Sequence, residues 1–151
     1  MNKAKKFIKK AAKLGSIDAH FMLARAYIRG EDVEEDYEKG LYHSYLAAMG
    51  GHERGRHNLG LMNKGLSNGN INHAMKHFMI AASCGYDVSM KEVGEGYKNG
   101  HVTKDEYAIT LRAHKDSRDK MKSKERDEAE AEVRINEALG IGMTESESNT
   151  N

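Results

Sequence analysis

The chain has 151 residues, 38% of them hydrophobic, and a formal net charge of +1. Its length corresponds to about one domain, and its near-neutral charge gives no indication of nucleic acid or of a strongly acidic partner. The lone cysteine, Cys84, excludes an internal disulfide and a cysteine-rich zinc site. No apolar run approaches the ~20 residues of a membrane-spanning helix and no signal peptide is evident, so we expect a cytoplasmic or nuclear protein.

Helical periodicity and end signals predict seven helices and no strand. The sequence contains no proline, which permits uninterrupted helices, and its 15 glycines favour short helices that end at glycine. Ser16, Asn70 and Asp87 are expected to cap helices, and Thr103 with Glu106 has the form of a capping box. In chain order the expected helices cover residues 3–14, 17–29, 35–49, 53–65, 70–84, 87–99 and 103–120, the last open to continuation as far as 139.

One residue pattern occurs three times, with offsets of 36 and 34 residues between copies. Two alanines are followed by a glycine, a small residue, an aliphatic residue and a second small residue. A helix aromatic closes the outer copies, and Asn63 stands in its place in the middle one. The repeat positions are Gly15, Ala19, Leu23 and Tyr27; Gly51, Gly55, Leu59 and Gly60; and Gly85, Ser89, Val93, Gly94 and Tyr97.

Each copy is interpreted as two antiparallel helices. The glycine after the two alanines lies at the end of the first helix, where the backbone is expected to adopt a left-handed conformation. The small residues of the second helix let the two helices approach each other closely. Such pairs cannot bury their apolar faces alone, so they are expected to stack into an all-α, right-handed α-solenoid. In the last helix Lys115 and Asp116 replace the alanine pair, which suits a polar terminal cap.

These residues resemble the Sel-one-like repeat family, relatives of the tetratricopeptide repeat. The matching segments are AAKLGSIDAHFMLARAYIRG, AAMGGHERGRHNLGLM and AASCGYDVSMKEVGEGYKNG, and VEEDYEKG is similar to the family linker through Val33 and Asp36. The resemblance covers residues 3 to 118. Gly40, Asn63 and the pair at 31–32 depart from the family pattern, which suggests a loosened middle repeat.

The resemblance implies a tetratricopeptide-like superhelix that serves as a non-enzymatic scaffold or adaptor for protein partners, with no cofactor. Residues 1–118 are expected to hold three repeats and a capping helix, residues 119–139 a charged helical extension, and residues 140–151 a disordered tail. The chain is expected to be a short family member or a fragment of a longer protein. Its partner and its oligomeric state stay open.

A peptide or helix of the partner is expected in a groove lined mainly by the first helix of each pair, as the resemblance implies. Tyrosine is common at binding hot spots, and methionine adapts to irregular surfaces. His43 and His77 recur at the repeat period, which favours a packing or groove-lining role. The candidate partner-binding residues are Tyr42, His43, Tyr45, His77 and Met79.

Three features suggest chemistry, and each has a structural alternative. His52, Glu53 and His57 nearly form a zinc protease motif, but the i, i+5 spacing separates the two rings by about 140° around a helix. The alternative is a repeat turn followed by a solvated helix start. His73 and His77 have i, i+4 spacing and could bind a metal weakly. For Cys84, a half-buried thiol fits better than a nucleophile.

The segment 3–13 carries six lysines and no acid. Its apolar residues share one face, so a basic amphipathic helix that binds an anionic membrane surface or nucleic acid is an alternative function. The repeat register favours an ordinary first helix with a solvated outer face.

Overall fold

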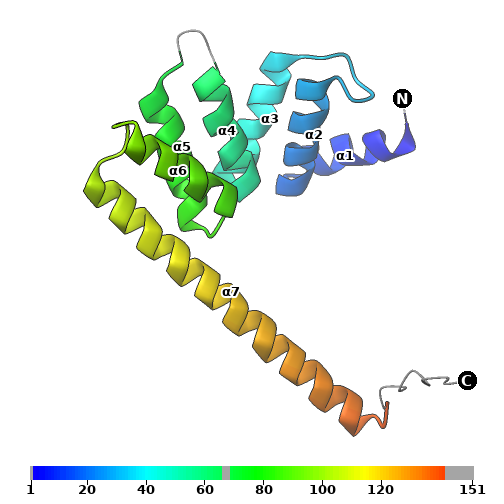
Figure 1. Ribbon diagram of the computed structural model, residues 1–151. Coiled ribbons are helices and arrows are strands. Elements are labelled where there is room, and N and C mark those ends of the chain that lie inside the picture. The colour runs from blue at the N-terminus through cyan, green and yellow to red at the C-terminus, as the bar shows by residue number, and fades with distance from the viewer. Residues whose placement is uncertain (1, 66–68, 142–151) are drawn as a thin grey trace, which may run out of the picture. The chain divides into compact units, whose positions relative to one another are not determined.

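The computed structural model describes residues 2–65 and 69–141, and within these ranges the chain forms seven helices and no strand (Figure 1). This confirms the all-α prediction, and the first six helices begin and end within two residues of the expected positions. The last helix begins one residue after the expected start and continues past residue 120 to Ala138, near the expected limit of 139. The helices are α1 (Lys3–Lys13), α2 (Ile17–Arg29), α3 (Tyr37–Met49), α4 (Glu53–Gly65), α5 (Ile71–Ser83), α6 (Asp87–Lys98) and α7 (Lys104–Ala138).

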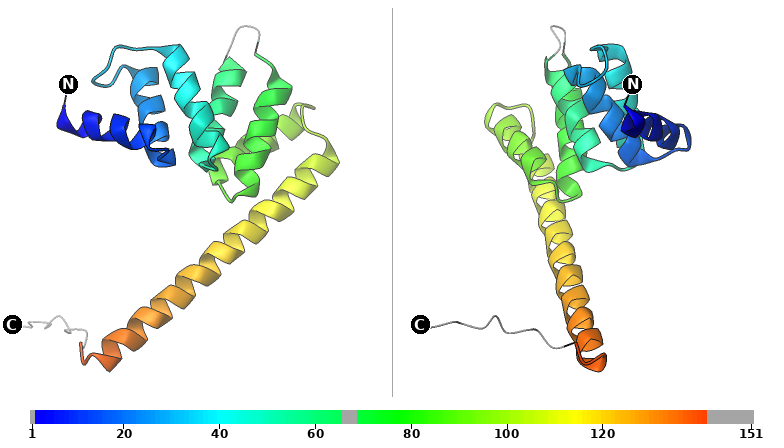
Figure 2. Two further views of the ribbon diagram at one scale, coloured as in Figure 1. Left: turned by 180° about the vertical axis from the view of Figure 1, so that it is seen from behind. Right: turned by 90° about the vertical axis from the view of Figure 1, so that its right-hand side faces the viewer.

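Consecutive helices pack against one another from α1 to α6, which is the arrangement of a helical-repeat solenoid. Figures 1 and 2 show α2, α3, α4 and α5 side by side in chain order. Residues 1–117 form one compact unit and residues 118–151 a second. The described part of the second unit is the rest of α7 and its end, where no side chain is buried.

Side-chain caps begin several helices, as the sequence predicts. Ser16 accepts a hydrogen bond from the backbone N–H of Ala19 at 3.3 Å, and Asn70 caps α5 in the same way. Thr103 and Glu106 cap α7 reciprocally: the Glu106 carboxylate accepts from the Thr103 N–H at 2.8 Å, and the Thr103 hydroxyl accepts from the Glu106 N–H at 3.2 Å. These bonds satisfy backbone donors that a helix start leaves unpaired.

The predicted cap at Asp87 is wrong. Tyr86 occupies the capping position of α6 without a side-chain bond, and Asp87 is the first residue inside the helix. Its carboxylate instead lies 2.9 Å from Nε2 of His114 on α7. The carboxylate still lies at the positive end of the helix dipole, so it favours the helix start from inside the first turn.

Glycine ends the first helix of each pair at the three repeat positions. Gly15, Gly51 and Gly85 have φ angles of 87°, 93° and 95°, a left-handed conformation that other residues adopt at a cost. In each case the N–H of the next residue donates to the carbonyl of the first alanine of the pair, as from Ser16 to Ala11 at 3.0 Å. The chain therefore turns sharply into the second helix at equivalent places.

The core is built from small side chains and a few large ones. Ala12, Ala19 and Leu23 form one buried cluster between α1 and α2. Phe78 of α5 is fully buried in a second cluster. That second cluster comprises Ala74, Met75, Phe78, Ala82, Val93 and Val102. Leu59 and Ser89 are also buried, so the aliphatic repeat positions and most of the small ones face the interior, with Gly94 as the exception.

Close helix approach depends on glycine at two repeat positions and not at a third. A Cβ on Gly55 would lie 2.9 Å from the Ala47 Cβ, and one on Gly60 would lie 2.5 Å from the Phe78 ring. Gly94, expected to be equivalent to Gly60, has no atom within 4 Å of such a Cβ. The crowded glycine of α6 is Gly96, because Met75 and Val102 pack over it.

The outer repeat aromatics pack on the helix that follows each pair. The Tyr27 ring is parallel to the His43 ring of α3, with centroids 5.8 Å apart, and the Tyr97 ring stacks on Tyr107 of α7 at 4.9 Å. In the middle copy, the Asn63 amide instead donates to the Leu59 carbonyl of its own helix at 2.8 Å. The middle repeat therefore lacks this ring contact.

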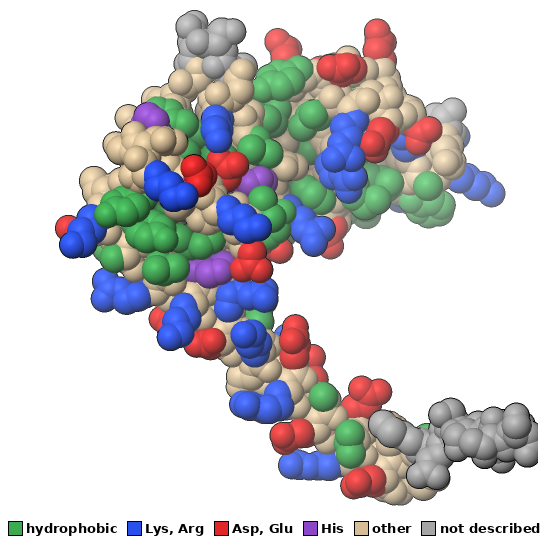
Figure 3. Space-filling view, viewed as in Figure 1, with side chains coloured by type: hydrophobic (Ala, Val, Ile, Leu, Met, Phe, Trp, Pro, Cys, Tyr) green, Lys and Arg blue, Asp and Glu red, His purple; other side chains and the backbone are tan. Residues whose placement is uncertain are grey.

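The tail expected to be disordered is residues 140–151, of which 142–151 lie outside the described residues. Within the described ranges, none of the helices has both the length and the apolar content that a bilayer crossing requires. On the face in Figure 3, acidic and basic side chains are interspersed over the surface.

Candidate functional site

Two grooves between helices lie in the unit formed by residues 1–117. The first, called here the histidine groove, has a volume of about 550 Å³ and draws its walls from α1, α2 and α3. It is lined by Lys9, Ala12, Lys13, His20, Leu23, Tyr27, Tyr42, His43 and Leu46. Six of these nine residues belong to α1 and α3, the first helices of their pairs.

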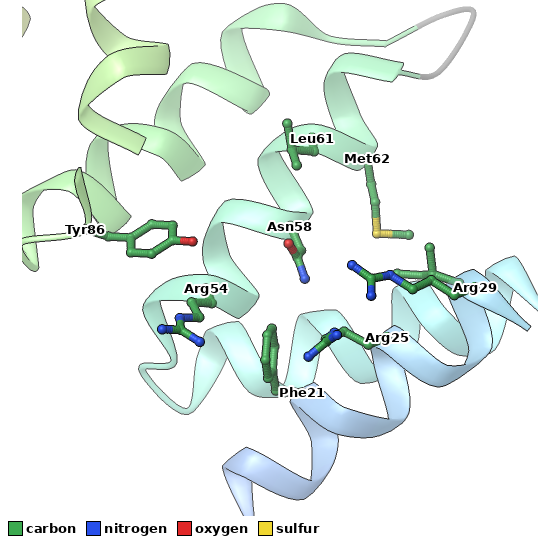
Figure 4. Close-up of a pocket in the computed structure, with 9 residues that line it drawn as sticks. Phe21, Arg25, Arg29, Arg54, Asn58, Leu61, Met62 and Tyr86 are labelled. Carbon is green, nitrogen blue, oxygen red and sulfur yellow. The ribbon is translucent and has the colours of Figure 1, made fainter. Parts of the chain in front are cut away.

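The second groove, called here the arginine groove, has a volume of about 270 Å³ and lies between α2 and α4, the second helices of their pairs (Figure 4). It is lined by Phe21, Arg25, Ile28, Arg29, Arg54, Asn58, Leu61, Met62 and Tyr86. The two grooves share no lining residue, although α2 contributes to both.

Two imidazoles meet at the histidine groove. Nδ1 of His20 lies 2.9 Å from Nδ1 of His43, a distance at which one nitrogen donates a proton and the other accepts it. The Tyr27 ring stacks on His43, and the Tyr42 ring meets the same imidazole edge-on at 5.3 Å. Burial lowers the pKa of His43, and the nearby His20 and Lys9 lower it further. Near neutral pH the groove therefore presents a neutral ring face with cations beside it.

Of the five predicted partner-binding residues, the structure brings Tyr42 and His43 together in the histidine groove. Tyr45 lies one turn further along α3, is 53% exposed and lines neither groove. His77 and Met79 lie on α5 and line neither groove. Met79 packs against the Phe78 cluster.

His77 is half-buried, and its Nδ1 has no hydrogen-bond partner. Burial lowers the pKa of its imidazole, with smaller effects of Arg56 and His73 in the same direction. Charging this ring would place an uncompensated cation beside other cations, so the neutral form is favoured.

His52 and His57 have separate structural roles. His52 precedes α4 and its Nδ1 accepts a hydrogen bond from the Gly55 N–H at 3.1 Å, while its ring stacks on Phe21 at 4.2 Å. The expectation of a solvated helix start is wrong for His57, which is 5% exposed. Its Nδ1 pairs with the Ser89 hydroxyl of α6 at 2.8 Å. The i, i+5 spacing places this ring on the inner face of α4.

Burial lowers the pKa of the His57 imidazole, and the charge of Glu92 opposes this effect. Among residues 2–65 and 69–141, no group of three or more histidine, cysteine, aspartate or glutamate side chains is placed to hold a metal ion. Cys84 is exposed, which corrects the expected half-buried thiol; it follows the buried face of α5 and its backbone caps the helix.

The first helix, α1, is an integral part of the fold. Lys5 is buried, and its ammonium donates to the Glu31 carbonyl at 3.0 Å and lies 3.6 Å from the Asp32 carboxylate. The apolar residues Ile8 and Ala11 pack against the cluster shared with α2. The packing against α2 therefore covers the part of the apolar face formed by Ile8 and Ala11, whereas Phe7 of the same face is 71% exposed.

Sequence reasoning missed the arginine groove. Arg25 and Arg29 are four residues apart, so they lie on one face of α2, and this spacing is a signal that the sequence contains. The approach of Arg54 depends on how α4 packs beyond α3. The repeat pattern consists mainly of buried positions, whereas these arginines occupy positions between them that differ from one repeat of the chain to the next.

The fold and its grooves define a helical-repeat protein of the kind that binds other proteins along helix faces. The Sel1 repeat pattern matches residues 1–16, 17–52 and 54–86, together more than half of the chain. The chain therefore belongs to the Sel1 repeat family. Proteins of this family generally act as protein-interaction scaffolds.

Solved structures with the same fold support this membership. A crystal structure of a Sel1 repeat protein from Oxalobacter formigenes aligns with a TM-score of 0.62 at 24% identity, covering 78% of this chain and 99% of that one. The protective antigen c5321 of uropathogenic Escherichia coli strains, which displays an SLR fold, aligns with a TM-score of 0.63 at 27% identity and covers 76% of this chain. The alignment spans 25% of that antigen's length. A comparison with curated proteins finds no match.

Proposed function

We propose that this protein is a non-enzymatic scaffold that binds a peptide or helix of a partner protein in the histidine groove. The observation that carries the proposal is the position of Tyr42, which is 60% exposed at a groove of about 550 Å³. An exposed aromatic ring held beside other rings offers a large contact area at a small cost in conformational entropy.

The chemistry of the groove suits an amphipathic segment. The partly exposed Leu46 and Tyr27 side chains supply apolar surface, and Tyr42 supplies both a ring and a hydroxyl. Lys9 and Lys13 of α1 flank this surface and can pair with acidic side chains of the partner. A helix that places an apolar side chain against the rings and an acidic one near α1 would satisfy both parts.

The proposed binding unit is residues 1–118, with residues 119–139 as a charged helical extension. Two bonds that hold the start of α7 to the end of α5 support the capping role: His114 Nδ1 lies 2.9 Å from the Ala82 carbonyl, and the Ser117 hydroxyl donates to the Ser83 carbonyl at 2.7 Å. A chain with one exposed cysteine suits a reducing compartment, which supports a cytoplasmic location.

Site-specific photo-crosslinking in the cells that express the protein tests the groove. A benzoylphenylalanine replaces Tyr42 in one variant and Tyr45 in the other. Tyr45 is the matched control because it lies on the same helix, is similarly exposed and lies outside the groove. We expect the probe at 42 to capture a partner segment that the probe at 45 does not, and mass spectrometry identifies that segment.

The identified segment is then synthesised and its affinity for the purified chain is measured by fluorescence anisotropy. Truncation of a hot-spot tyrosine costs about 2 kcal/mol, so Tyr42→Ala is expected to weaken binding by about thirtyfold. Tyr45→Ala is expected to change it less than about threefold. Equal losses in both variants, or crosslinks at 45 alone, would show that the histidine groove is not the binding site.

A further inference from the structure

The arginine groove has an uneven distribution of charge along its length. Figure 4 shows Arg54 at one end and Arg25 with Arg29 at the other, with the Phe21 ring between them. Leu61 and Met62 of α4 add apolar surface. The lining contains three guanidinium groups and no carboxylate.

These arginines are poorly neutralised by the chain itself. Within the described residues, no acidic side chain lies at ion-pair distance from Arg54 or Arg25, and the Arg25 guanidinium lies 6.0 Å from the centre of the Phe21 ring. Arg29 contacts the Glu31 carboxylate at 3.3 Å, but both side chains are more than half exposed. An exposed pair of this kind contributes little, so a ligand carboxylate can replace it.

The arrangement of charge indicates the chemistry of a ligand. Guanidinium groups bind carboxylates through paired hydrogen bonds, and they hold positive charge at any physiological pH. Because two cationic ends flank an aromatic ring, a complementary segment carries acidic side chains on both sides of an apolar or aromatic one. We infer that the arginine groove is a second docking surface, which binds such an acidic segment of a partner protein.

A peptide fits these observations better than a nucleic acid. Binding to a nucleic acid backbone draws its affinity from many phosphate contacts over a basic surface. This chain has a net charge of +1, and the surface in Figure 3 shows acidic and basic groups interspersed. Three arginines around an apolar floor instead match the size of a short peptide epitope. The inference goes beyond the proposed function, since the two grooves share no lining residue.

A displayed library of random twelve-residue peptides tests the inference and does not require the identity of the partner. The library is selected on the wild-type chain and on the variant Arg25→Glu/Arg54→Glu. Both side chains are exposed, so reversal of their charge is expected to leave the fold intact, which circular dichroism verifies. Peptides that bind only the wild type are expected to carry acidic residues on both sides of an aromatic or aliphatic residue.

The most enriched peptide is then labelled and titrated by fluorescence anisotropy. We expect Arg25→Glu and Arg54→Glu each to weaken binding about tenfold or more, and higher salt to weaken it further. Arg112→Glu is the matched control, because Arg112 is an exposed arginine of α7 outside the groove, and it is expected to change the affinity less than twofold or so. A copy of the peptide with glutamine in place of each acid is expected not to bind.

Three outcomes would overturn the inference. The first is that the two selections yield the same peptides, or that the discriminating peptides lack acidic residues. The second is that Arg112→Glu weakens binding as much as the groove variants, since that result would indicate a general effect of charge. The third is that a single-stranded oligonucleotide binds more tightly than the peptide with the same dependence on Arg25 and Arg54. None of these results bears on binding at Tyr42.

Discussion

His57 shows how one side chain joins two repeats. It is buried between the Phe78 and Tyr86 rings, with centroids 5.2 Å and 5.3 Å away, and it reaches Ser89 across the helix interface. Ser89 is itself fully buried, so its hydroxyl depends on this partner. A buried hydroxyl without a hydrogen bond costs free energy, and the pair therefore couples α4 to α6.

Replacing His57 with alanine is expected to destabilise the fold. The change removes ring packing and leaves the Ser89 hydroxyl unpaired, so we expect the free energy of unfolding to fall by about 2–4 kcal/mol. Urea unfolding followed by circular dichroism measures the difference. The exposed His101 is the control, and His101→Ala is expected to stay within about 0.5 kcal/mol of the wild type. Equal stabilities of the two variants would contradict the buried role of His57.

At the scale of the helix, glycine serves two different purposes. In α4, Gly60 lets the helix lie directly against the Phe78 ring of α5. In α6, Gly94 faces open space and contributes only backbone flexibility, which a helix interior must restrict. The same residue type at equivalent repeat positions therefore has opposite effects on stability.

Alanine substitutions at the two positions should change stability in opposite directions. At Gly60 the new Cβ would lie 2.5 Å from a ring carbon that is itself fully buried, so we expect a loss of about 1–3 kcal/mol. At Gly94 the Cβ meets nothing, and the gain in helix propensity should stabilise the protein by about 0.5–1 kcal/mol. The urea unfolding midpoints of the two variants, each compared with that of the wild type, test this expectation. A stabilising Gly60→Ala would show that α4 and α5 are not packed as described.

The repeat pattern predicts the elements well because their ends are local. Left-handed glycines and capping side chains determine where a helix starts and stops, and each of these signals depends on only a few adjacent residues. Which residue packs over a given helix face depends on parts of the chain that are more distant in the sequence. Gly94 matches Gly60 in the pattern, yet Val102 from the turn after α6 packs over Gly96 instead.

The candidate site is less predictable from sequence for the same reason. The i, i+5 spacing correctly separates His52 from His57, but it does not say that the second ring meets Ser89 of another repeat. Likewise Arg25 and Arg29 form a visible pair, whereas their approach to Arg54 needs the packed structure. The periodicity of one helix shows which of its residues share a face, but only the tertiary packing shows which residues of other helices contact that face.

Across the whole repeat unit, three histidines share an electrostatic property. Burial lowers the pKa of His43, His57 and His77 from the usual value of 6.5. They belong to α3, α4 and α5, so the effect is spread over the centre of the fold. In the unfolded chain these rings take up protons near their usual pKa, while in the folded chain they resist protonation. Acid therefore favours the unfolded state.

Stability is accordingly expected to fall as the pH is lowered from 7.5 to 5. A depressed histidine pKa stabilises the fold fully above about 6.5, and its contribution declines below that pH because the unfolded state binds more protons. The carboxyl pKa values of Asp36 and Glu106 are also lowered, by hydrogen bonds from Lys39 and Thr103. Their contributions are lost only below the usual carboxyl range, so the window above pH 5 isolates the histidines.

Urea unfolding at half-unit pH intervals measures this dependence. We expect the unfolding midpoint to decrease steadily from pH 7 to pH 5, with net proton uptake on unfolding in calorimetry carried out in two buffers. His57→Phe keeps a ring in the core but removes one proton-binding site, so the slope of its stability against pH should be shallower than that of the wild type, whatever its absolute stability. A midpoint that is constant or rises on acidification would show that these imidazoles are not held neutral by burial. An unchanged slope in His57→Phe would show that the acid sensitivity arises elsewhere in the chain.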